Sequence, residues 1–101
     1  MKIVFRREAR RELLAAQLWF ETKSPGLGFE FARAVEAAIA AVQRNPRAYS
    51  AVEVGCRRIL LRRFPYAVFY RLRDEELLIV AVFHQRQRPG AWRDRVTSSG
   101  T

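Results

Sequence analysis

One side chain in this sequence suits proton transfer at neutral pH: the imidazole of His84, the only histidine. It stands where a hydrophobic run ends, so it could serve as a general acid or base. The competing interpretation is structural, with His84 forming hydrogen bonds at a strand end and helping to dock Trp92. A lone histidine has no evident catalytic partner in the sequence, so we favour the structural role.

Cysteine, metal and phosphate-loop chemistry find little support in the sequence. Cys56 is the only cysteine, which excludes an internal disulfide and leaves it without a catalytic partner in sequence. No spacing of His, Cys, Asp and Glu forms a metal-ligand cluster. Gly26-Leu27-Gly28 is not a phosphate-binding loop, because no strand precedes it and no Lys-Ser/Thr follows. The sequence therefore predicts neither a metal nor a cofactor.

Positive charge is the strongest chemical signal. Nineteen Lys and Arg residues against ten Asp and Glu give a net charge of +9, and seventeen of the nineteen are arginine. This charge favours a polyanionic partner: nucleic acid, a ribosome or an acidic protein. Guanidinium groups pair well with carboxylate and phosphate. We predict a binding role for eight arginines of the C-terminal half: Arg57, Arg58, Arg62, Arg63, Arg71, Arg73, Arg86 and Arg88.

Length and hydropathy limit what kind of protein this is. With 101 residues there is room for one core, and we predict a single domain over residues 1–96 with a disordered tail over 97–101. The longest apolar run, Leu77 to Phe83, is too short to cross a bilayer. Charges follow the first residues too soon for a signal peptide, and a lone cysteine suits a reducing compartment. We therefore predict a cytoplasmic protein without a membrane partner.

The first half of the chain shows a short strand followed by two helices. Lys2–Arg6 alternates as a strand does, and helical periodicity runs over about Glu8–Lys23 and Phe29–Arg44. On the first helix, Ala9, Leu13, Ala16 and Phe20 form the apolar stripe, widened by Leu14, Leu18 and Trp19; Phe29 is also assigned to the core. The segment Ser24–Gly28 ends the first helix and joins it to the second. Because this connection is so short, the two helices must fold back on each other as an antiparallel hairpin.

The second half shows three strands: Cys56–Arg62, Tyr66–Arg73 and Leu77–His84. The polar connection Asp74–Glu76 suits a β-hairpin. Leu77–Phe83 does not alternate, which predicts a central strand covered on both faces. Alternate residues share a face, so Arg58 and Arg62 are expected to join Arg71 or Arg73 in one patch. The order is β-α-α-β-β-β, an α+β fold with a helical hairpin packed on one antiparallel sheet.

The ordered motifs of this chain resemble a known family, the ParE branch of the RelE/ParE toxin superfamily. The matching residues span about nine-tenths of the chain. They are Glu12-Leu13, Trp19-Phe20-Glu21, Pro25-Gly26-Leu27-Gly28 with Phe31, Asn45-Pro46 with Tyr49, Arg57-Arg58, Arg63-Phe64-Pro65-Tyr66 with Tyr70, and His84, Arg88-Pro89, Trp92 and Arg95.

The resemblance implies the toxin of a type II toxin–antitoxin system, neutralised by a cognate antitoxin that threads an acidic or amphipathic segment over it. ParE-type members are associated with inhibition of DNA gyrase without hydrolytic chemistry. RelE-type members cut messenger RNA in the ribosome. The eight arginines would then contact the target or the antitoxin.

Two departures weaken the RelE-type reading. In RelE-type toxins, basic side chains on the sheet face and a tyrosine near the C-terminus resemble the set of groups that RNA cleavage needs. Here the only lysines, Lys2 and Lys23, lie outside the C-terminal strands, and no tyrosine follows the last strand. A second subgroup of ribosome-dependent toxins uses a glutamate, an arginine and a histidine. In this chain that set would be Glu53, Arg58 or Arg71, and His84.

The sequence therefore favours a non-enzymatic gyrase inhibitor over two alternatives. One alternative is a metal-independent, ribosome-dependent endoribonuclease centred on His84. The other is an inactive toxin retained as an antitoxin-binding partner.

Overall fold

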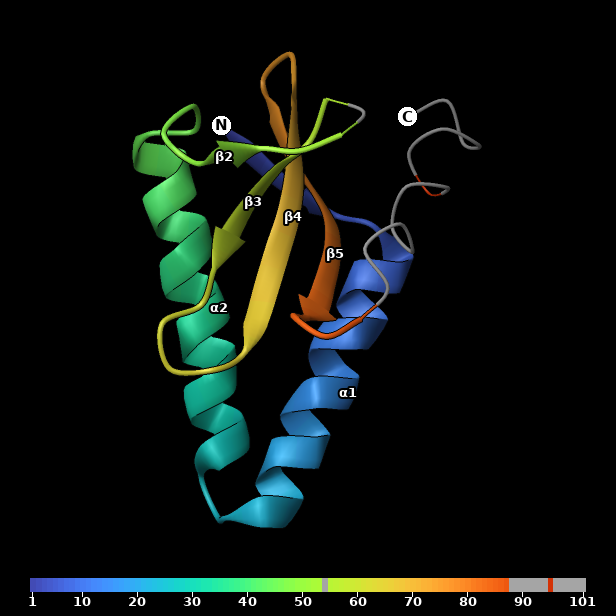
Figure 1. The fold of residues 1–101 in the computed structure, drawn as a ribbon, viewed down its shortest axis with the longest axis vertical. Helices are drawn as coiled ribbons and strands as arrows, with labels where there is room; N and C mark the ends of the chain where they lie inside the picture. The colour runs from blue at the N-terminus through green and yellow to red at the C-terminus, as the bar shows by residue number, and fades with distance from the viewer. Residues whose placement is uncertain (54, 88–94, 96–101) are drawn as a thin grey trace.

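In the computed structural model, two helices and five strands follow one another along the chain (Figure 1). The structure describes residues 1–53, 55–87 and 95; the predicted tail, Arg88 and Trp92 lie outside them. The elements are β1 (Lys2–Phe5), α1 (Arg7–Lys23), α2 (Leu27–Arg44), β2 (Ser50–Ala51), β3 (Arg57–Leu60), β4 (Tyr66–Arg73) and β5 (Glu76–His84). None of the described helices is long and apolar enough to cross a membrane.

The strands form one sheet in the order β1-β5-β4-β3-β2. The prediction of an antiparallel sheet is wrong in one respect, because β1 runs parallel to β5. Those two strands lie at opposite ends of the chain, so no tight turn forces them to be antiparallel. The short strand β2, which the sequence did not indicate, pairs only with the first two residues of β3. The α+β class and the helical hairpin are confirmed.

The connection between β4 and β5 is shorter than expected. It consists of Asp74 and Glu75 alone, because Glu76 already belongs to β5. Asp74 has a φ of 53°, a left-handed conformation that aspartate tolerates better than most residues. The two-residue turn sets the register that pairs Arg73 with Glu76.

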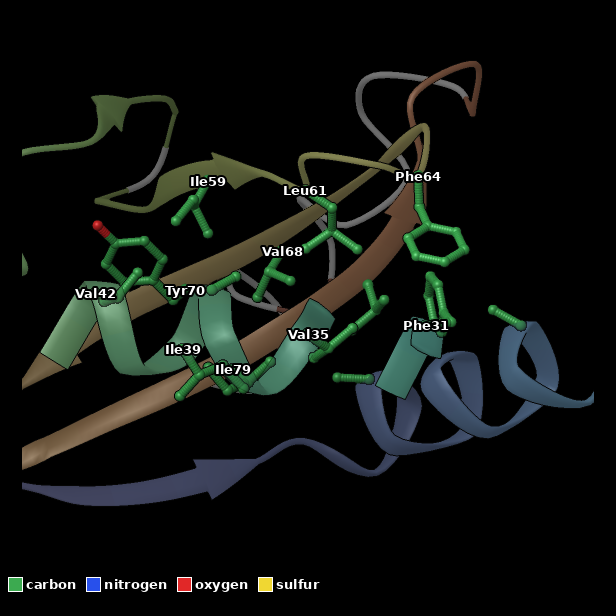
Figure 2. Close-up of a cluster of buried hydrophobic side chains, with 14 of the residues drawn as sticks. Phe31, Val35, Ile39, Val42, Ile59, Leu61, Phe64, Val68, Tyr70 and Ile79 are labelled. Carbon is green, nitrogen blue, oxygen red and sulfur yellow. The ribbon is translucent and has the colours of Figure 1, made fainter. Parts of the chain in front are cut away.

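Both helices pack on one face of the sheet, α1 against β5 and α2 against β3 (Figure 1). Figure 2 shows the core between the helices and the sheet, where buried side chains of α2 meet those of three strands. The labelled residues are Phe31, Val35, Ile39 and Val42 from α2, Ile59 from β3, Leu61 and Phe64 from the following loop, Val68 and Tyr70 from β4, and Ile79 from β5. These four residues of α2 recur at helical spacing on its buried side.

An aromatic cluster closes one end of this core. The rings of Phe20 and Phe31 stack at 5.1 Å between centroids, and both meet Phe64 edge to face at 4.9 and 5.2 Å. Tyr66 adds a fourth ring, 5.0 Å from Phe31. The cluster joins both helices to the loop between β3 and β4, and such ring pairs stabilise beyond the area they bury.

The predicted apolar stripe of α1 is narrower than expected. Ala9, Ala16 and Phe20 are buried, but Leu14, Leu18, Trp19 and Phe29 of the hairpin are each more than half exposed. A helix lying on a sheet with one neighbouring helix has only part of its circumference covered. The exposed residues project on the uncovered part.

The strand β5 is central, as its unbroken apolar sequence predicts. All residues from Ile79 to Phe83 are buried. A bulge leaves Val80 unopposed, because Phe69 pairs with Ala81 while Tyr70 pairs with Ile79. Val80 and Ala81 consequently both join a second apolar cluster, on the sheet face away from the helices.

A polar bridge completes the outer edge of β5 where β1 no longer covers it. The pairing of β1 ends at Phe5 opposite Ile79. Beyond that point the N–H of Val82 donates to Glu12 Oε1 at 3.0 Å, and the carbonyl of Val80 accepts from the Arg95 guanidinium at 3.1 Å. Glu12 and Arg95 also form a two-point ion pair with each other. These two side chains satisfy backbone groups that a further strand would otherwise pair.

The turn of the helical hairpin is held by a single carboxylate. Glu21 accepts hydrogen bonds from the backbone N–H of Gly26 at 2.9 Å and of Gly28 at 3.0 Å. It thereby satisfies N–H groups at the start of α2, where the capping residue Gly26 offers no side chain. A Cβ at position 28 would overlap the carbonyl oxygen of Gln17. Glycine is therefore required there for the two helices to approach.

We expect Gly28→Ala to lower the free energy of unfolding by about 2 kcal/mol, because the added methyl group must push the two helices apart. Gly26→Ala is the matched control. Gly26 has a left-handed φ of 86° but open space around it, so its substitution costs only the backbone strain, about 1 kcal/mol. Urea unfolding followed by circular dichroism measures both. A Gly28→Ala protein at least as stable as the control contradicts the close-approach explanation.

Candidate functional site

A groove of about 930 Å³ runs between α2 and the part of β3 that β2 does not cover. Its helical wall presents four alanines, Ala34, Ala37, Ala38 and Ala41, at the spacing of one helix face. Its other wall is β3 with the loop that follows, where the half-exposed residue Leu60 is part of the lining. The small alanine side chains leave the space that a larger residue would fill. We call this feature the α2–β3 groove.

The backbone of β3 is open toward the groove. Leu61 N donates to Tyr66 O at 2.9 Å, so the N–H and C=O of the preceding residue, Leu60, point away from β4. The pairing of β2 stops at Arg58, and Leu60 therefore faces no strand among the described residues. An extended segment in the groove would find one donor and one acceptor there.

Arginines surround the groove. Arg33 and Arg44 come from α2, and Arg62 and Arg63 from the loop after β3. Glu30 is the one acid in the lining, and it is bonded to Arg63 at 2.8 Å. Within the described part of the chain, Arg33, Arg44 and Arg62 have no carboxylate partner. The rim is therefore positively charged, which suits an acidic ligand.

Two hydrogen bonds fix the segment that closes one end of the groove. The Tyr70 hydroxyl donates to the carbonyl of Pro46 at 2.8 Å, and Arg57 donates to the carbonyl of Tyr49 at 2.7 Å. Burial raises the pKa of Tyr70, and Arg57 opposes part of that rise. Arg57 lies opposite Tyr70 on the helix-covered face, so its guanidinium supports the fold at this point.

The predicted arginines do not form one patch. Arg62 and Arg63 lie at the groove, whereas Arg58 and Arg71 lie on the open face of the sheet as diagonal neighbours. Arg73 follows Arg71 on that face and is exposed. Arg62 follows the end of β3 at Leu60, so strand alternation no longer ties its side chain to the face of Arg58. Arg86 is exposed after β5, and Arg88 lies outside the described residues.

Of the residues of the endoribonuclease alternative, Glu53 and Arg71 lie toward one end of the sheet and His84 toward the other, with Arg58 opposite Phe69 between them. Arg71 lies opposite Leu78 and His84 opposite Tyr66, a separation of six residues or about 20 Å along β5. Glu53 precedes β3, toward the end of the sheet far from His84. The Nδ1 of His84 accepts a hydrogen bond from Arg86 N at 3.0 Å, and its ring packs edge to face on Tyr66.

Cys56 is also placed away from any catalytic arrangement. It is buried beside β3, and burial raises the pKa of its thiol, which opposes formation of the reactive thiolate. Arg71 lowers that pKa only in part.

The groove itself was not anticipated from the sequence. Arg33 and Arg44 lie in the helical half of the chain, outside the predicted set. The available signal was the run of alanines at 34, 37, 38 and 41, which an ordinary core helix also shows. Only the position of α2 beside a sheet edge turns that face into a groove.

Replacing Tyr70 with phenylalanine tests the anchored segment. The raised pKa means that the folded state favours the neutral form of the Tyr70 phenol. The stability that the neutral phenol contributes is therefore present at neutral pH and is lost as the pH rises through the folded-state pKa. We expect Tyr70→Phe to cost about 1 kcal/mol at neutral pH through the lost hydrogen bond. Above about pH 10, we expect the free energy of unfolding to fall less in the Tyr70→Phe protein than in the wild type. Urea unfolding at both pH values measures this, and an unchanged alkaline loss contradicts it.

Comparison with known proteins agrees with this architecture. The family described as "ParE toxin of type II toxin-antitoxin system, parDE" matches residues 3–89. Among solved structures, the chain is similar to one described as "Chromosomal ParDE TA system from P. aeruginosa". The sequences are 22% identical, the match covers 83% of this chain and 95% of that chain, and the TM-score is 0.73. No match is found among curated protein sequences. The family match spans most of the chain, and this protein is therefore a ParE-type toxin of a type II toxin–antitoxin system.

Proposed function

We propose that this toxin inhibits DNA gyrase by binding to it, and that a cognate antitoxin neutralises it by placing an acidic amphipathic segment in the α2–β3 groove. The observation that carries the proposal is the groove itself, with its alanine wall and its rim of arginines. Arg33, Arg44 and Arg62 are available to carboxylates, since no acid of the described chain pairs with them.

The chemistry of the groove specifies what kind of segment it takes. Apolar side chains of the segment would lie against the alanines, while its carboxylates would reach the arginine rim. A stretch in extended conformation would also pair with the outward N–H and C=O of Leu60. A nucleic acid would use the arginines but not the apolar wall. An acidic amphipathic protein segment uses both.

Binding is better supported than RNA cleavage as the toxic activity. Cleavage needs a group that activates the 2′-hydroxyl, an acid for the leaving oxygen and a charge that stabilises the phosphorane. Arg71 pairs with Leu78, six residues from His84 along β5, and Nδ1 of His84 already accepts a backbone hydrogen bond. The arginines of the open face, Arg58, Arg71 and Arg73, stay predicted contacts of the target or the antitoxin.

The gyrase proposal predicts that the purified protein blocks supercoiling of relaxed plasmid at near-stoichiometric ratios to gyrase. His84→Gln, which removes the imidazole but keeps a hydrogen-bond acceptor, should inhibit equally because no acid–base step is involved. Full supercoiling activity in a large excess of folded protein would sink the proposal. Transcripts cut on programmed ribosomes by the wild type, but not by His84→Gln, would support the endoribonuclease instead.

The groove proposal predicts that Arg62→Glu weakens antitoxin binding about tenfold, because a carboxylate then stands where the segment's acid must lie. Arg47→Glu is the matched control, an exposed arginine after α2 that is outside the groove lining. Titration calorimetry with the antitoxin encoded beside the toxin gives both affinities. Equal affinities for the two variants would place the antitoxin elsewhere.

A further inference from the structure

The solvent side of α1 carries an ordered stripe of four exposed residues. Arg7, Arg11, Leu14 and Leu18 follow one another at spacings of four, three and four. At 100° per residue these positions fall within an arc of about 60° on the helix. Leu14 is 53% exposed and Leu18 is 69% exposed, and both arginines are exposed as well. We call this feature the α1 outer stripe.

The stripe is separate from the core and from the α2–β3 groove. The opposite side of α1 holds the buried residues Ala9, Ala16 and Phe20 against the sheet. The groove is lined by α2, β3 and the segments after them, and no residue of α1 contributes to it. In Figure 1 the two helices lie side by side, with the groove strand β3 next to α2 and not next to α1.

The charges of the stripe are unsatisfied. Neither Arg7 nor Arg11 has an ion pair within the described part of the chain. The nearby acid Glu8 forms an ion pair with Arg6 at 3.6 Å, and the carboxylate of Glu21 is used by the hairpin turn. The stripe thus offers two guanidinium groups followed by two leucines, without an acid of its own.

This composition selects among possible occupants. A second copy of the chain is unfavourable: a parallel arrangement opposes arginine to arginine, an antiparallel one opposes arginine to leucine, and each copy carries a net charge of +9. A nucleic acid would pair with the arginines and leave both leucines exposed. A helix with apolar residues and carboxylates at the same spacing satisfies all four positions, because the four-three-four pattern is that of helices packed along a seam.

We infer that the α1 outer stripe docks an acidic amphipathic helix on the surface of the toxin's target, DNA gyrase. The inference rests on the proposed function, in which the antitoxin segment occupies the groove and the target is gyrase. Leu14 and Leu18 bury apolar area against the helix, and Arg7 and Arg11 pair with its carboxylates.

Matched single substitutions test this assignment with gyrase holoenzyme and with the full-length antitoxin. Leu18→Gln and Arg11→Glu should each lower the affinity for gyrase about tenfold and leave the affinity for the antitoxin unchanged. The controls are Phe29→Gln, which alters a side chain of the hairpin that is also 69% exposed, and Arg47→Glu. Both should retain wild-type affinity for gyrase. Circular dichroism confirms folding, which exposed positions on helices tolerate.

A photo-crosslinker gives a second readout that does not depend on loss of binding. With p-benzoylphenylalanine in place of Leu18, ultraviolet light should join the toxin to gyrase, and in place of Phe29 it should not. Wild-type protein that neither binds nor inhibits gyrase contradicts the proposed function. Stripe variants that inhibit gyrase as strongly as the wild type, or the absence of a crosslink from position 18, overturn only the inference about the α1 outer stripe. Stripe variants that lose affinity for the antitoxin but still inhibit gyrase would assign the stripe to the antitoxin. That result also overturns the inference that the stripe binds gyrase.

Discussion

The carboxylate of Glu21 and the missing side chain of Gly28 together set the geometry of the helical layer. Glu21 binds two N–H groups at the start of α2, and Gly28 lets α2 approach the backbone of α1 at Gln17. With the two helices held at this spacing, Phe20 and Phe31 stack and receive Phe64 from the sheet side. The close approach of the two helices at Gly28 also decides which helix surfaces stay exposed, one on α2 beside β3 and one on the outside of α1.

The two edges of the sheet differ in whether their backbone hydrogen-bonding groups are paired within the chain. Beyond the end of β1, the outer edge of β5 is satisfied from within the chain, by Glu12 on the N–H of Val82 and Arg95 on the carbonyl of Val80. At the other side β2 covers only the first half of β3 and leaves Leu60 open. An open strand edge attracts further strands. Its position beside an apolar, basic groove is the reason we propose this edge as the binding place of the neutralising segment.

The large positive charge is divided into arginines that serve the fold and arginines that remain available. Arg57 binds a loop carbonyl, Arg63 neutralises Glu30, and Arg95 closes the edge of β5. Several of those that pair with no acid of the described chain lie at the groove rim and on the outside of α1. Because these places also carry apolar surface, the charge favours acidic protein partners over a bare polyanion.

The sequence by itself determined every element except the short strand β2, because helical and strand periodicity are local properties. Pro25 and Pro46 mark helix ends, Tyr66–Arg73 is β4 as predicted, and the unbroken apolar run identified β5 as central. Tertiary structure alone decided that β1 joins β5 in parallel, that Arg62 borders the groove, and that His84 stands far from Arg71. It also decided that Leu14 and Leu18 are exposed and that the alanines of α2 border a groove. Periodicity states which residues share a face, but only the packing of distant segments decides what, if anything, covers it.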